Sequence, residues 1–103
     1  MTPRLFAPRA RRELRDAAAW VAADNPAAAE GLLRATLRAA ELVATKPGIA
    51  RIRLDLAPAR FRFWSSRGYP YLLVFDIERT PPVVARFVHQ ARDLPVLLND
   101  LEM

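Results

Sequence analysis

The clearest structural signal in the chain is an unbroken apolar run at residues 71–77. Six of its seven residues are apolar or aromatic, and glycine and proline residues flank it. A run without polar alternation is typical of a strand buried on both faces, and the flanking breakers leave too few residues for a helix. A second apolar run follows a short turn at residues 83–89, so we expect the two strands to pair in antiparallel fashion.

Two stretches upstream have the period of an amphipathic helix. The first covers about residues 9–23, and the second runs from residue 26 to about residue 45. In each stretch, apolar residues recur at helical spacing and form one stripe along the helix. Asn25 is a good N-cap for the second helix, and Pro26 suits its first turn. Only residues 24 and 25 separate the two patterns, which predicts a tight helical hairpin.

Shorter segments complete the predicted order. Residues 4–7 form a short candidate strand, and the alternating residues 60–65 form another. Residues 49–59 are predicted to be an irregular connection, and the apolar tail at residues 96–98 a last helical turn on the core. Helices grouped ahead of an antiparallel sheet are typical of an α+β fold with two layers. We therefore expect a β-α-α-β-β-β chain whose last three strands form an antiparallel meander.

Length and composition restrict the classes of function. At 103 residues we expect a single domain spanning residues 1–103. The absence of cysteine excludes disulfide frameworks, thiolate catalysis and Cys-based zinc sites. No apolar run approaches the ~20 residues of a membrane span, and early arginines interrupt any signal-peptide core, so we expect a cytoplasmic protein without membrane association. No Gly-rich phosphate loop, carboxylate cluster or histidine set at metal spacing occurs, so we expect neither a cofactor nor a metal.

The net charge of +5 is unevenly distributed. Residues 1–67 hold 13 basic and 6 acidic side chains, a balance of +7, whereas residues 68–103 hold 3 and 5, a balance of −2. Fifteen of the sixteen basic residues are arginine, whose planar fork suits a carboxylate or a phosphate. An acidic protein partner and a nucleic acid are both candidates. A GC-rich genome explains the abundance of arginine and alanine equally well.

Four groups of residues, taken in order, carry a resemblance to a known family. They are Ala10 with Glu13-Leu14 and Asn25-Pro26-Ala27-Ala28-Ala29; Lys46-Pro47-Gly48; Tyr69-Pro70-Tyr71-Leu72-Leu73-Val74-Phe75; and Arg86-Phe87-Val88-His89-Gln90-Ala91-Arg92-Asp93. They resemble the helix hairpin, the Pro-Gly stop, the central strand and the closing word of the ParE/RelE superfamily, the toxins of type II toxin–antitoxin modules. The resemblance covers nearly the whole chain, and the closing word is its most specific part.

The resemblance implies one of two activities. RelE-like members are ribosome-dependent mRNA endonucleases, which tend to carry a lysine-rich centre and a Tyr or His near the C-terminus. ParE-like members are associated with poisoning DNA gyrase and lack the nuclease residues. Here the closing word is of the ParE kind, the only lysine is Lys46, and no tyrosine follows Tyr71.

On this resemblance we expect a ParE-like toxin that inhibits DNA gyrase by binding it. The expected partner is a co-encoded antitoxin, ParD-like or similar, whose extended acidic segment wraps the toxin in a hetero-oligomer. The alternative is a RelE-like mRNA interferase, whose partners are the ribosome and its message. A third, weaker hypothesis is a degenerate member that only binds its antitoxin.

For the nuclease alternative, the candidate catalytic residues are Arg60, Arg62, Arg86 and His89. An RNA-cleaving site must activate a 2′-hydroxyl, stabilise the charge on the phosphorane and protonate the leaving oxygen. The arginines can supply the electrostatic part if their strands place them on one face of the sheet. His89 is the default acid or base, because histidine is the side chain that ordinarily titrates near neutral pH.

His89 and Arg86 each have a structural alternative, which we favour. His89 ends an apolar strand and can instead hydrogen-bond to nearby backbone or to Asp93. Arg86 lies between apolar neighbours and can instead pair with a carboxylate such as Asp76 or Asp93.

Five residues are candidates for partner binding: Arg12, Trp20, Arg60, Trp64 and Arg92. Trp20 points roughly 100° away from the apolar stripe of its helix, so it either packs on the edge of the hairpin or anchors a partner. Trp64 shares a strand face with Arg60 and has the same two interpretations. We expect at least one of the two tryptophans to contact a partner.

Two charged groups keep alternative interpretations. Arg12 belongs to a basic cluster at residues 9–15, which either contacts nucleic acid or an acidic antitoxin tail, or is a solvated helix face. Arg92-Asp93 either contacts the target of the toxin or forms a terminal cap and salt bridge.

Overall fold

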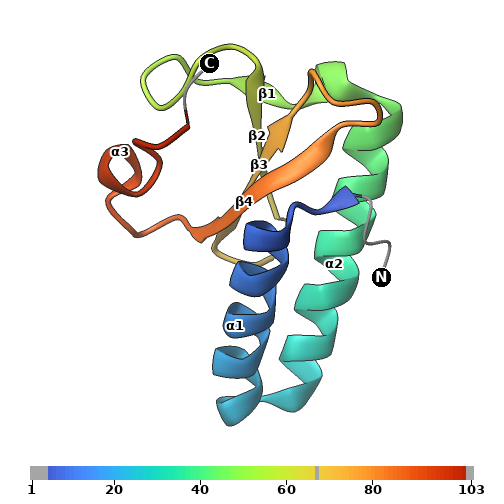
Figure 1. Cartoon of the computed structure of the whole chain (residues 1–103). Helices are drawn as coiled ribbons and strands as arrows, with labels where there is room; N and C mark the ends of the chain where they lie inside the picture. Colours follow the sequence, from blue (N-terminus) through green and yellow to red (C-terminus); the bar gives the residue numbers. More distant parts are fainter. Residues whose placement is uncertain (1–4, 67, 102–103) are drawn as a thin grey trace.

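The computed structural model describes residues 5–66 and 68–101. Two long helices, α1 (Pro8–Asp24) and α2 (Pro26–Thr45), open this part of the chain as an antiparallel hairpin (Figure 1). The side-chain oxygen of Asn25, which links them, accepts a hydrogen bond from the backbone N–H of Ala28 at 3.1 Å and so caps α2. The predicted hairpin is confirmed, with helix ends within one residue of those expected. Among the helices described, none has the length and apolar character needed to cross a membrane.

Four antiparallel strands form the sheet: β1 (Arg51–Ile52), β2 (Phe61–Ser65), β3 (Tyr71–Asp76) and β4 (Val83–His89). They lie in the order β1-β2-β3-β4, so β1 and β4 are the two edges. All of β3 is buried and β4 pairs with it antiparallel, which confirms the predicted central strand and its partner. A 3₁₀ turn, η2 (Pro47–Ile49), precedes β1, and a short helix, α3 (Leu94–Leu97), follows β4.

Two parts of the predicted order are wrong. The sheet has four strands and not three, because Arg51 and Ile52 pair with β2 inside the segment predicted to be an irregular connection. The predicted strand at residues 4–7 is reduced to an isolated parallel bridge between Phe6 and Val84, since Pro8 starts α1 immediately afterwards. Arg4 lies outside the described residues. Both elements are too short to impose a readable alternation on the sequence.

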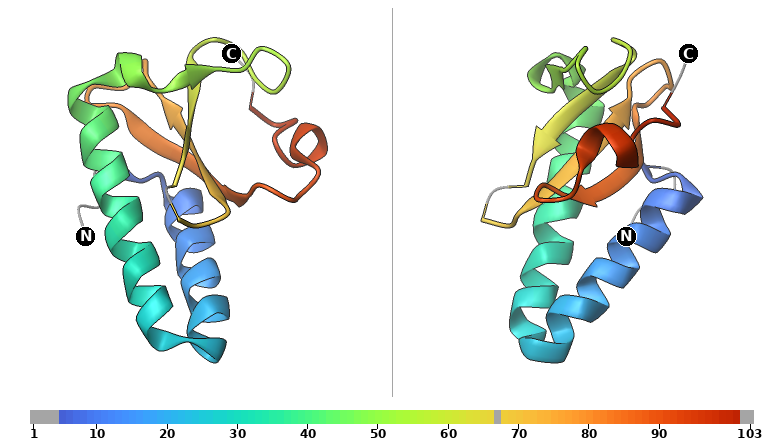
Figure 2. Two further views of the ribbon diagram at one scale, coloured as in Figure 1. Left: turned by 180° about the vertical axis from the view of Figure 1, so that it is seen from behind. Right: turned by 90° about the vertical axis from the view of Figure 1, so that its left-hand side faces the viewer.

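The sheet separates two apolar layers, with the helical hairpin on one side and the C-terminal turn around α3 on the other (Figure 2). Leu73 and Phe87 pack toward the hairpin, whereas Val74 and Val88, at alternate positions, pack beneath the C-terminal turn. Leu98 is fully buried in this second layer, which confirms that the apolar tail is a helical turn packed on the core. The α+β fold is therefore that expected from the order of helices and strands.

Candidate partner-binding site

A groove with a volume of about 620 Å³ runs along the β4 edge of the sheet, between α1 and α3. It brings together four residues that the sequence singled out: Trp20, Arg86, His89 and Arg92. Trp20 comes from the second half of α1, and the other three come from β4 or the turn that follows it. Residues separated by about 70 positions in the chain therefore share one surface.

The bottom of this groove is an arginine that is 2% exposed, Arg86. Its Nε and Nη2 atoms donate hydrogen bonds to the carboxylate of Glu13, the closest at 2.9 Å. Its Nη1 atom donates to the backbone carbonyl of Leu97 at 3.0 Å and to the carboxylate of Asp100 at 3.2 Å. All three nitrogens are thus satisfied by α1 and the C-terminal turn, which ties both segments to β4.

The expected ion pair of Arg86 is confirmed, but the two partners expected for it, Asp76 and Asp93, are wrong. Asp76 instead accepts a hydrogen bond from Arg60 at 2.7 Å, and Asp93 does not reach Arg86. Asp76 lies at the other end of β3 from the groove, beyond a register shift between β3 and β4. Helix packing brings Glu13 closer, although it is 73 positions away in the sequence.

Glu13 and Asp100 extend the contacts of Arg86 into a network with zero net formal charge. One oxygen of Glu13 also accepts the backbone N–H of Phe87 at 3.0 Å, so α1 satisfies a donor on the outer edge of β4. Asp100 also pairs with Arg9. Burial alone raises the pKa of Asp100, but the hydrogen bond from Arg9 and the charges of Arg9 and Arg86 outweigh it and hold that pKa below its usual range.

Replacing Asp100 with asparagine is expected to make stability less dependent on pH in acid. A carboxylate whose pKa is lowered on folding stabilises the folded state above about pH 4, and this contribution disappears as the pH falls through the lower pKa of the folded protein. Urea denaturation between about pH 4 and pH 2 should therefore show a shallower loss of stability for Asp100→Asn than for the parent. Asp24→Asn, at the exposed end of α1, is the matched control and should follow the parent.

His89 occupies the end of β4 at the rim of the groove. Its Nδ1 atom accepts a hydrogen bond from the backbone N–H of Ala91 at 3.0 Å, and its ring lies edge-on to Tyr71. The structural alternative for His89, a bond to nearby backbone, is confirmed. Because Nδ1 is an acceptor here, the neutral ring carries its proton on Nε2.

The four candidate catalytic residues do not converge. Arg86 pairs with Val74 and lies on the face of the sheet that packs under the C-terminal turn. Arg62 and His89 lie on the opposite face, which packs against the helical hairpin. Arg62 and His89 pair with opposite ends of β3, which separates them by roughly 13 Å along the strands. Arg60 is engaged with Asp76 and Glu78, and the hydrogen bond to Asp76 raises its pKa. The condition that these side chains share one face is not met.

The residues proposed for partner binding fall into two groups. Trp20 is 80% exposed, and Arg92 is exposed beside the same groove. Arg12 is exposed on α1 but does not line the groove. Trp64 is half-buried against the hairpin-side core, and Arg60 lies near the end of β2 that is remote from His89. Among the described residues Arg92 and Asp93 form no ion pair, and the Asp93 side chain does not cap α3, so the cap interpretation is wrong.

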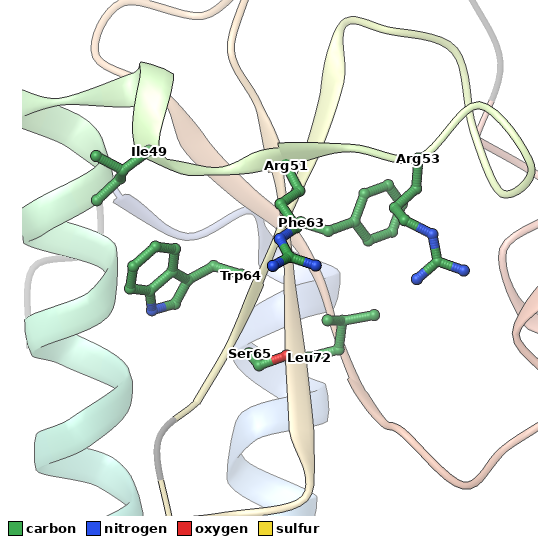
Figure 3. A pocket seen from close by; sticks show the side chains of 7 residues that line it. All are labelled: Ile49, Arg51, Arg53, Phe63, Trp64, Ser65 and Leu72. Atoms are coloured by element: carbon green, nitrogen blue, oxygen red, sulfur yellow. The ribbon is translucent and has the colours of Figure 1, made fainter.

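A second cavity, of about 330 Å³, lies at the opposite edge of the sheet beside β1 (Figure 3). Arg51 and Arg53 extend over it, and Phe63, Leu72 and Ser65 form its floor. None of the residues predicted to bind a partner except Trp64 lines this site, because residues 49–59 were predicted to be irregular. Arg51-Ile52-Arg53-Leu54 does alternate basic and apolar residues, but over four positions this alternation is too short to predict a strand by itself.

The α+β fold, with two helices ahead of a four-stranded antiparallel sheet, is consistent with a toxin of a type II toxin–antitoxin system. Residues 5–94 match the family model described as the ParE toxin of the type II toxin–antitoxin system parDE. That match spans most of the chain, so the protein belongs to the ParE toxin family, and the resemblance in its sequence is confirmed. Membership of this family implies that the protein has an antitoxin as its partner. A search among curated proteins returned no match.

Proposed function

We propose that this toxin inhibits DNA gyrase by binding it, without catalysing hydrolysis, and that a co-encoded acidic antitoxin neutralises it. The observation that carries the proposal is the groove along β4, which presents a highly exposed tryptophan beside an exposed arginine. Tryptophan and arginine are the side chains most often found at the energetic centres of protein interfaces. An exposed tryptophan on a helix has no packing role that would account for it.

The state of the charged residues also favours binding over RNA cleavage. Arg86 is 2% exposed and paired with two carboxylates and a carbonyl, so its charge is already compensated and turned away from any bound phosphate. Arg60 and Arg62 are on β2 or beside it, two strands away from His89. Cleavage of RNA needs a preorganised set of groups around one phosphate, which these positions do not supply.

The acidic antitoxin follows from the charge distribution. Residues 1–67 carry a balance of +7, and arginines recur along the outward surface of the helices. An acidic segment therefore gains favourable long-range attraction to this half of the chain. Gyrase acts in the cytoplasm, so the toxin is placed there as well, acting as one domain.

The test uses the purified full chain in two assays run in parallel. One follows supercoiling of relaxed plasmid by gyrase and the release of cleaved DNA after protein denaturation; the other follows a message during translation by ribosomes. The proposal predicts lost supercoiling or trapped DNA cleavage together with intact message. Ribosome-dependent cleavage of the message that disappears in His89→Ala would establish the interferase instead. Absence of both activities would leave antitoxin binding alone and would also overturn the proposal.

A further inference from the structure

Two charged side chains that line the groove along β4 have no ion pair. Asp16 comes from α1, and Arg92 comes from the turn after β4. Among the residues that the structure describes, neither forms a salt bridge. The charges of Arg9, Glu13 and Arg86, which also line the groove, are compensated within the network around Arg86. The groove therefore keeps one uncompensated carboxylate and one uncompensated guanidinium, on different elements.

The carboxylate lies beside an open aromatic ring. Asp16 and Trp20 are one helical turn apart on α1, a spacing that places two side chains on the same helix face with Cβ atoms about 6 Å apart. The Trp20 side chain is 80% exposed, so its indole ring is open to a ligand. A cation is attracted both by the charge of a carboxylate and by the quadrupole of an indole. An apolar ligand would gain contact with Trp20 but would take water from Asp16 without replacing its hydrogen bonds.

Arginine suits this pair of groups better than lysine does. A planar guanidinium can lie flat on an indole while its N–H groups point sideways into a carboxylate. An ammonium is a more strongly hydrated point charge and cannot stack. Because Asp16 is exposed, an ion pair with it would contribute little alone. The stacking on Trp20 is what makes this position selective.

The arginines of the chain itself leave this position open. Arg12 precedes Asp16 by one helical turn, but it forms no ion pair with Asp16 in the part of the chain that the structure describes, and it does not line the groove. Arg9 does line the groove, but it pairs with Asp100. The Asp16 carboxylate is therefore available to a cation from outside.

The charges also indicate what else the occupant carries. A purely basic segment would approach a chain with a net charge of +5, which opposes association. A purely acidic segment would meet Arg92 but would bring like charge to Asp16. A segment that carries both an arginine and a carboxylate can satisfy both groups of the groove.

We propose that the groove along β4 binds an arginine side chain of the toxin's protein target. The guanidinium stacks on Trp20 and pairs with Asp16, and a carboxylate of the same segment pairs with Arg92. This inference rests on the proposed function, which assigns the groove to the target, and it adds the chemistry by which a target segment is selected.

The first measurement uses a capped synthetic peptide with one arginine and one glutamate, separated by about three glycines so that the charges can reach groups up to about 13 Å apart. The controls are the same peptide with lysine, and with citrulline, the uncharged isostere of arginine. We expect the arginine peptide to bind the full chain at least about tenfold more tightly than the citrulline peptide and about threefold more tightly than the lysine peptide. In the NMR spectrum it should shift the indole N–H signal of Trp20, identified by its loss in Trp20→Ala, and leave that of Trp64 in place.

A matched pair of variants separates this inference from the proposed function. Asp16→Asn should reduce the preference for arginine over citrulline to about twofold or less, whereas Asp24→Asn, an equal charge change at the exposed end of α1, should keep it. Asp16→Asn should also raise the toxin concentration that halves gyrase supercoiling by about tenfold, and Asp24→Asn should not.

The outcomes are distinguishable. If the parent fails to inhibit gyrase but prefers arginine through Asp16, the arginine site stands and the proposed target is wrong. Equal affinity for the arginine and citrulline peptides would overturn the inference even where gyrase is inhibited, and so would an equal loss of preference in the two variants. A single-stranded oligonucleotide that shifts the Trp20 signal at lower concentration than the arginine peptide would also overturn it.

Discussion

Replacing Glu13 with alanine is expected to lower the free energy of unfolding by about 3 kcal/mol, because it leaves the charge of Arg86 buried with only part of its shell. Arg86 is 2% exposed and loses its shortest contact, and the backbone N–H of Phe87 loses its acceptor at the same time. Asp100 remains, and Glu13 itself is 23% exposed, so the loss falls at the lower end of the range for broken buried pairs.

Urea denaturation measures this loss without adding salt, which would screen the remaining charges. Asp16→Ala, on the exposed side of the same helix, is the control and should stay within about 0.5 kcal/mol of the parent. Arg86→Met tests whether the loss of stability comes from an unpaired buried charge or from lost packing, since it removes the charge and keeps most of the side-chain volume. Arg86→Met should lower the free energy of unfolding less than Glu13→Ala does. The Glu13 carboxylate that it leaves unpaired still accepts the hydrogen bond from the Phe87 N–H and is accessible to water. An equal loss in both variants would show that the pair stabilises the fold mainly through packing.

The parts of the fold that were predicted correctly are those that produce a local periodic pattern in the sequence. The helical stripes, the Asn25 cap and the unbroken run of β3 each depend on residues within a few positions of one another. β1 has two residues, and the bridge at Phe6 has one, so neither repeats often enough to produce a pattern. Their formation depends on the strands beside them.

The candidate site was predicted less well, for two different physical reasons. The carboxylates around Arg86 come from α1 and from the C-terminal turn, and only tertiary packing brings them together. The division of the candidate catalytic residues, by contrast, was already readable: Arg86 and His89 are three positions apart in one strand, and an odd spacing places side chains on opposite faces. Both residues still line the groove at the edge of the sheet, but the spacing already indicated that their side chains leave the strand on opposite faces.

The two edges of the sheet differ in what closes them. The β4 edge is closed by α1 and by Ala7, the residue before it: the backbone N–H of Phe87 donates to Glu13, and that of Ala7 donates to the carbonyl of Val84. Ligands at this edge therefore meet side chains. The β1 edge keeps its backbone groups outward, so a ligand there can pair with main chain. Ligands at the two edges therefore meet different kinds of surface, side chains at β4 and main chain at β1.

Replacing Trp20 with alanine is expected to weaken inhibition of gyrase by about 30-fold or more, the usual cost of removing an anchoring tryptophan from an interface. Stability should change by less than about 0.5 kcal/mol, since the side chain is 80% exposed and contributes little to the core. The measurement is the toxin concentration that halves supercoiling, with urea denaturation of the same preparations beside it. Trp20→Phe should recover part of the loss, because it restores an aromatic surface.

The matched control for Trp20 is Val96→Ala, which removes an apolar side chain that is 64% exposed on α3 and does not line the groove. It should inhibit gyrase as the parent does. If Trp20→Ala keeps full inhibition but loses affinity for the antitoxin, the groove belongs to the neutralising partner and the target must bind elsewhere. If both variants lose inhibition equally, apolar surface near the C-terminal turn matters generally and Trp20 is not an anchor. A loss confined to Trp20→Ala, at unchanged stability, would place the target contact on the second half of α1.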